Sequence, residues 1–155
     1  MLVHEIMTTA VECCVPTDTA QHAAEIMRKV DIGVIPVLAG ETDPKVVGMV
    51  TDRDLCMAVV AEGRDSRQVR VQECMTGKVV ALNAEDDVEH AAEVMAEAQV
   101  RRLPVVGQNG SILGIVALAD VARAVELASN VGDAVRDISE PTSELTAQRE
   151  DDKAG

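Results

Sequence analysis

The chain has 155 residues with a formal net charge of −13, and it contains no Phe, Trp or Tyr. So negative a chain is repelled by phosphate backbones and anionic membranes, which disfavours binding to nucleic acid or to a membrane surface. No stretch reaches the roughly 18 apolar residues of a membrane span, and the first residues lack a signal-peptide pattern, so a cytoplasmic protein is expected.

The sequence contains two copies of one unit. A stretch that begins at Val3 returns at Val71, and Met7 and Pro36 of the first copy keep the same spacing from their equivalents in the second. Each copy is too short to bury a sufficient core alone, so the two are expected to share one. The predicted divisions are a first unit over residues 1–60, a polar linker over 61–70, a second unit over 71–128, and an extension over 129–155, largely disordered at its end.

Each copy begins with a short β-prone run followed by an amphipathic helix. The runs are Val11 to Val15 and, in the second copy, Val79 to Leu82. The helix starts are marked by Asp18 and Asp86, each with a Gln or Glu three residues later, a spacing typical of a capping box. Met27 and its equivalent in the second copy fall on the apolar stripe and are expected in the core.

Two β-branched runs joined by a polar turn follow in each copy and predict a hairpin, after which a last helix begins near Asp54 or Asp120. The runs are 34–38 and 46–50 in the first copy, and 103–106 and 112–116 in the second. The predicted fold class is therefore α/β, in the α+β arrangement, with two β-α-β-β-α units.

The sequence offers little for catalysis or for a metal. Its cysteines, Cys13, Cys14, Cys56 and Cys74, lack a C-x-x-C spacing and are expected to be free thiols. No nucleophile stands beside a base, and no carboxylate pair forms a recognisable active-site motif. Neither an enzyme nor a metal site is predicted.

The strongest local signal lies where the last strand of the first unit enters its last helix. Gly48 allows close approach of a ligand to the backbone, and Thr51 offers a hydroxyl at a helix N-terminus. Asp54 can accept hydrogen bonds from two vicinal hydroxyls, as acidic residues of dinucleotide-binding folds do with ribose. However, Thr51 and Asp54 would also make a good helix cap without any ligand, and the spacing leaves both interpretations open.

Together with Met-Thr at the start of each unit and with Ile35-Pro36-Val37 and Leu103-Pro104-Val105, this segment resembles the CBS domain, named for cystathionine beta-synthase. The resemblance covers about residues 3 to 126 and is to free-standing tandem pairs of bacteria. It implies an intramolecular pair with pseudo-twofold symmetry and two clefts for adenosine compounds. The implied ligand is AMP, ADP or ATP, with S-adenosylmethionine or NADH as alternatives.

The implied function is regulatory. Such a module would form a homodimer through its helices and control an unknown partner protein or its own assembly. The alternative is a ligand-independent oligomeric scaffold or stress protein whose nucleotide sites have degenerated.

The resemblance implies two unequal clefts. In the first, Asp54 would bind the ribose, an arginine pair from the second unit would bind phosphate, and Val79 and Val80 would lie beside the base. The implied residues of this cleft are Met49, Thr51, Arg53, Asp54, Val79, Val80, Arg101, Arg102 and Pro104.

The second cleft departs from the family pattern, because Ala117 replaces the threonine and Gly33-Val34 replaces the arginine pair. It is expected to lack cationic contacts and to be empty, weak or structural. Its implied residues are Glu12, Val34, Ile35 and Asp120.

Overall fold

The structure is a computed structural model that describes the backbone of residues 1–139 and the side chains of residues 1–130. The disorder expected at the end of the C-terminal extension falls on residues 140–155, which lie outside the described residues.

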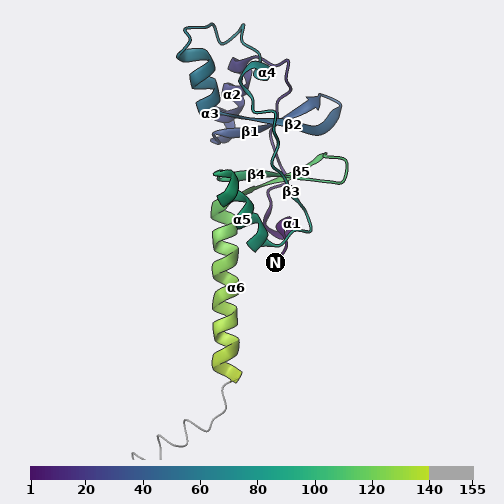
Figure 1. The fold of residues 1–155 in the computed structure, drawn as a ribbon, viewed down its shortest axis with the longest axis vertical. Coiled ribbons are helices and arrows are strands. Elements are labelled where there is room, and N and C mark those ends of the chain that lie inside the picture. Colours follow the sequence, from purple (N-terminus) through teal and green to yellow (C-terminus); the bar gives the residue numbers. More distant parts are fainter. Residues whose placement is uncertain (140–155) are drawn as a thin grey trace, which may run out of the picture.

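Two units of mixed helix and strand lie one above the other (Figure 1), which confirms the expected fold class. The first unit contains α2 (Ala20–Val30), β1 (Val34–Gly40), β2 (Asp43–Thr51), α3 (Asp52–Leu55) and the π-helical turn η1 (Cys56–Val60). The second contains β3 (Leu82–Asn83), α5 (Val88–Ala98), β4 (Arg102–Val106), β5 (Ile112–Ala117) and α6 (Leu118–Ser139).

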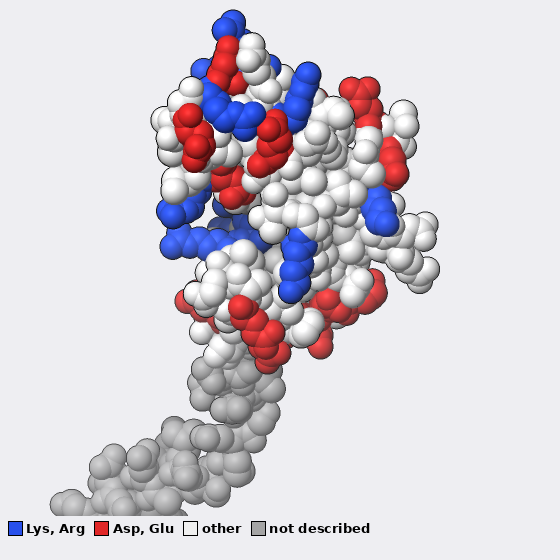
Figure 2. Space-filling model, turned by 45° about the horizontal axis from the view of Figure 1, so that its top comes forward, with Lys and Arg blue, Asp and Glu red and all other residues white. Residues whose placement is uncertain are grey.

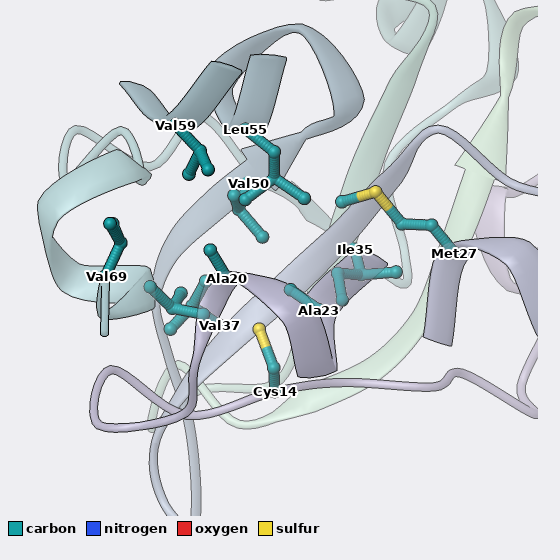
Figure 3. Packing of buried hydrophobic residues seen from close by; sticks show 11 residues of the cluster. Cys14, Ala20, Ala23, Met27, Ile35, Val37, Val50, Leu55, Val59 and Val69 are labelled. Atoms are coloured by element: carbon teal, nitrogen blue, oxygen red, sulfur yellow. The ribbon is translucent and has the colours of Figure 1, made fainter. Parts of the chain in front are cut away.

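Both predicted hairpins form, and their β-branched residues build two separate cores, one in each unit, so the expectation of a single shared core is wrong. Strands β1 and β2 are antiparallel with Ile35 opposite Val50, and β4 and β5 pair in the same way. In the first unit, Met27 of α2 lies near Ile35 of the sheet, and Val59 of η1 belongs to the same buried cluster (Figure 3). Because the chain has no aromatic residue, this core is filled by aliphatic side chains and sulfur alone.

The first predicted strand of each copy is much shorter than expected. In the run Val11 to Val15, only Cys14 pairs, in a single parallel bridge with Val37. In the second copy only Leu82 of the predicted run lies in a strand, β3, which pairs parallel to β4. Proline follows the first run directly, and since proline has no N–H to donate, pairing cannot continue there.

Helices α2 and α5 each begin one residue later than predicted. Thr19 is the N-cap of α2, and its hydroxyl accepts a hydrogen bond from the His22 N–H at 3.1 Å. Asp18 instead accepts from the Val15 N–H at 2.9 Å and closes the preceding turn. Asp86 likewise accepts from the N–H of Asn83. The acidic residues therefore shape the approach to each helix and do not cap it.

The two units exchange their N-terminal segments. Helix α1 (Val3–Ile6) packs on the second unit, and α4 (Val71–Cys74) packs on the first (Figure 1). Val3 lies in the core of the second unit, whereas Val69 and Val71 lie in the core of the first, all three with 0% exposure. The predicted polar linker thus contains a fully buried core residue, Val69, because the chain remains on the first unit from η1 through α4 and crosses to the second unit only afterwards.

The Met-Thr motif of each copy forms backbone hydrogen bonds with the second hairpin strand of the other copy. Thr76 donates its N–H to the Met49 carbonyl at 2.9 Å and accepts from the Met49 N–H at 3.1 Å, and Thr8 makes the equivalent pair with Ile115. A Cβ on Gly48 would lie 2.7 Å from the Thr76 carbonyl oxygen, closer than real Cβ atoms approach. The sequence interpretation of Gly48 as a place for ligand approach is therefore wrong, since the close neighbour is the exchanged backbone.

The final helices of the two units differ. Helix α3 ends at Leu55 and passes into η1, whereas α6 continues to Ser139 and projects beyond the second unit (Figure 1). In the described part of the chain, none of the helices combines the length and apolarity that a membrane span requires.

Candidate functional site

A cavity of about 650 Å³ lies between the two units. The junction of β2 with α3 forms one wall, and the junction of α5 with β4 forms the other. Eight of the nine residues expected in the first cleft line this cavity, and Val79 does not. Its lining also includes Gly33, Val34, Asp52, Thr76, Lys78, Ala98, Gln99, Val100 and Leu103.

Thr51 and Asp54 form a reciprocal cap at the start of α3. The Thr51 hydroxyl accepts from the Asp54 N–H at 3.0 Å, and Oδ2 of Asp54 accepts from the Thr51 N–H at 2.9 Å. The cap interpretation left open by the sequence is thus observed. The cap uses only one oxygen of the Asp54 carboxylate. Oδ1 makes no hydrogen bond with the described residues, and Asp54 lines the cavity, so this oxygen can accept from a ligand.

The charge of this cavity is opposite to that of the whole chain. Four cationic side chains line it, those of Arg53, Lys78, Arg101 and Arg102, against two carboxylates, Asp52 and Asp54. In Figure 2, one group of basic side chains lies at mid-height on the left, and others lie at the top, in the centre and on the right of the same face. Such a surplus of cations in a concave site favours an anionic ligand.

Lys78 was missed by the sequence analysis, although the repeat held a signal. Its equivalent in the first copy is Ala10, and Ala10 lines only the smaller cavity. A position-by-position comparison of the two copies therefore shows that the second copy has a positive charge, Lys78, where the first copy has none.

The second cleft is a smaller cavity of about 150 Å³. All four residues expected there line it, and Ala117 leaves it without the hydroxyl of the first cleft. The expectation that it lacks cationic contacts is wrong, because Arg102 lines this cavity as well as the larger one. The Asp120 carboxylate accepts from the guanidinium of Arg123, one turn further along α6.

The four cysteines are free, as expected. Burial raises the pKa of Cys13 to about 11 and that of Cys14 to about 12, so both are neutral thiols in the folded protein. No cysteine lines the larger cavity. Among the described residues, no three His, Cys, Asp or Glu side chains gather closely enough to hold a metal ion.

Comparison with known proteins finds matches over both units. The family model of the CBS domain matches residues 3–61 and 71–127. The CBS domain-containing protein YhcV of Bacillus subtilis (strain 168) is 39% identical over 137 residues, which cover 88% of this chain and 94% of YhcV. The crystal structure of Hypoxic Response Protein I with two coordinated zinc ions has a TM-score of 0.71 at 33% identity, covering 79% of this chain and 98% of that one.

A second solved structure was determined with ligands. The CBS domain pair of protein MJ0100, in complex with 5′-methylthioadenosine and S-adenosyl-L-methionine, is 26% identical with a TM-score of 0.71. The similarity covers 81% of this chain and 96% of that one. A match over 81% of this chain is too long to be confined to one unit.

Proposed function

Because this chain belongs to the CBS domain family as a tandem pair, we propose that it is a regulatory module that binds AMP, ADP or ATP in the larger cavity. One observation carries this proposal: a cavity of about 650 Å³ is lined both by Asp54, whose Oδ1 makes no hydrogen bond with the described residues, and by four cationic side chains. A nucleotide needs both, since its ribose offers vicinal hydroxyls and its phosphates carry the negative charge. The ligands of the similar MJ0100 pair support an adenosyl compound.

The lining residues divide the ligand between the two units. Asp54 accepts from the ribose hydroxyls through Oδ1, while Oδ2 stays in the cap and holds the side chain in place. Arg101 and Arg102 bind the phosphates from the opposite unit, because a guanidinium keeps its charge and can donate two parallel hydrogen bonds. Met49, Val80 and Pro104 supply the apolar wall for the base.

Binding across the two units gives the module its means of regulation. A ligand held from both sides stabilises the paired arrangement that forms the cavity, and it shifts the chain toward the state that binds it better. A partner protein, or a second copy of the chain, that recognises this arrangement would then respond to nucleotide concentration.

S-adenosylmethionine and NADH are the alternative ligands. The sulfonium of S-adenosylmethionine would meet four cationic side chains, whereas the diphosphate of NADH would be attracted by them. We therefore expect S-adenosylmethionine to bind more weakly than ADP.

An oligomeric scaffold is the second candidate, and one observation favours it. An apolar groove of about 360 Å³ runs between α2 and the α3–η1 segment, lined in part by Met27, Leu55 and Val59. Val60, which also lines the groove, is 74% exposed, and Met57 of the same η1 segment is 54% exposed. Exposed apolar helices of this kind suit a homodimer, and sedimentation at micromolar concentration tests it, since a monomer would count against both the scaffold and the dimer.

Isothermal titration of the full chain with AMP, ADP, ATP, NADH and S-adenosylmethionine tests nucleotide binding. A ligand at about 100 times its dissociation constant should add roughly 2.7 kcal/mol of stability, which a thermal shift detects. Asp54→Asn keeps a side-chain acceptor for the cap but loses the charge, and it should weaken binding. The matched variant Asp52→Asn removes the other lining carboxylate and should not. Absence of binding tighter than millimolar, or equal binding by both variants, would contradict the proposal.

A further inference from the structure

Two equivalent positions in the repeat lie where the two cavities adjoin. Val34 is the first residue of β1, opposite Thr51, and Arg102 is the first residue of β4, opposite Ala117. Val34 and Arg102 occupy the same place in their units, and both side chains line both cavities. A symmetric pair would carry two arginines here or none, whereas this chain has one arginine for two clefts.

The guanidinium of Arg102 is not committed to either cleft. Among the described residues, it takes part in no hydrogen bond and no ion pair. The acidic residues of the smaller cleft have other cations nearby, since Asp120 pairs with Arg123, and Oε1 of Glu12 lies 3.9 Å from Nζ of Lys29. Arg102 is only half-buried, so its side chain can reorient without leaving a buried charge unpaired.

We propose that Arg102 is shared between the two clefts and couples them. An anion in the larger cleft draws the guanidinium to itself, which leaves the smaller cleft without the one cation among its described lining residues. Conversely, the carboxylate of Glu12 attracts Arg102 toward the smaller cleft and weakens anion binding in the larger one. This inference rests on the proposed nucleotide site, and it adds that the pair holds one anionic ligand per chain and that Glu12 sets its affinity from the other cleft.

A double-mutant cycle tests the coupling, with ADP as the probe and titration calorimetry of the full chain as the measurement. Glu12→Gln should tighten ADP binding by about two- to fivefold, as expected for a weak coupling between charges of one network. In the Arg102→Ala background, the same change should have no effect. Glu12 is exposed and does not line the larger cavity, so its substitution alters neither the fold nor a direct contact with ADP.

A control separates this coupling from the general field of the protein. Glu41→Gln removes an exposed carboxylate from the β1–β2 turn, which lines neither cleft, and should leave ADP affinity unchanged. If Arg102→Ala binds too weakly to be titrated, the cycle is repeated at low ionic strength, where the remaining cations bind ADP more tightly.

Each outcome bears on a different statement. The shared role of Arg102 would be overturned if Glu12→Gln tightened ADP binding equally with and without Arg102, or did not tighten it at all. Either result would leave the proposed nucleotide site intact. Two ADP molecules per chain would overturn it as well. If the wild-type chain bound no ADP, the proposed nucleotide function and the coupling would both fail.

Discussion

Replacing Gly48 by alanine tests the exchanged arrangement of the two units. The new Cβ would lie 2.7 Å from the Thr76 carbonyl oxygen and 3.0 Å from Sδ of Met75. The methionine can move, but the carbonyl is held by its hydrogen bond with Met49, so the exchanged segment must shift as a whole. Overpacking of this kind costs about 1–3 kcal/mol, which for a chain of this size corresponds to a fall in melting temperature of about 2–12 °C.

Gly77→Ala is the matched control, one residue further along the same segment. A Cβ there meets nothing within 4 Å. Its backbone φ is negative, so alanine should be neutral or stabilise by about 0.4–1 kcal/mol through the unfolded chain. Unfolding is best followed by far-ultraviolet circular dichroism, because the chain has no Trp or Tyr to fluoresce. A Gly48→Ala protein as stable as the Gly77→Ala protein would refute the close approach of the exchanged backbone.

Three further predictions concern single side chains. Val69→Ala should cost about 2 kcal/mol in urea unfolding, since Val69 is fully buried, whereas the exposed neighbour in Gln68→Ala should cost almost nothing. Lys78→Ala should weaken ATP binding more than AMP binding in calorimetry, and an equal loss for both would exclude a contact with the outer phosphates. Because burial raises the pKa of Cys14 to about 12, the stability that its thiol contributes is present below about pH 9 and lost as the pH rises toward 12. Mass spectrometry at about pH 8 should therefore find Cys14 alkylated far more slowly than the exposed Cys56, and equal rates would contradict its burial.

The parts of the fold that depend on local pattern were predictable from the sequence. The β-branched runs form the expected hairpins, and Met27 and Met95 are buried as the apolar stripe requires. Local chemistry was less decisive at the helix starts, where Asp18 and Thr19 both make good caps. In the structure the Asp18 carboxylate accepts a hydrogen bond from the Val15 N–H. The helix is therefore capped by the Thr19 hydroxyl, and this could not be read from the sequence.

What the sequence could not provide depends on contacts between the units. Val69 stands in a polar stretch, and a single valine gives no periodicity from which burial could be inferred. Gly48 correctly marked a close approach, but the approaching group is Thr76, which lies in the other copy. The sharing of Arg102 by two clefts follows from pseudo-twofold geometry, and no spacing along one chain reports which cavities a side chain lines.

The exchange of N-terminal segments also constrains the order of folding during synthesis. Val3 is synthesised before the first unit, yet the core that buries it includes Leu103, Val116 and Val121, which are synthesised after that unit. The first unit likewise waits for Val69 and its neighbours before its core closes. The segment around Val3 therefore stays unburied while the whole first unit is synthesised, and contacts of such long range slow folding. The two clefts are lined by residues of both units, so neither can form before the second unit has been synthesised.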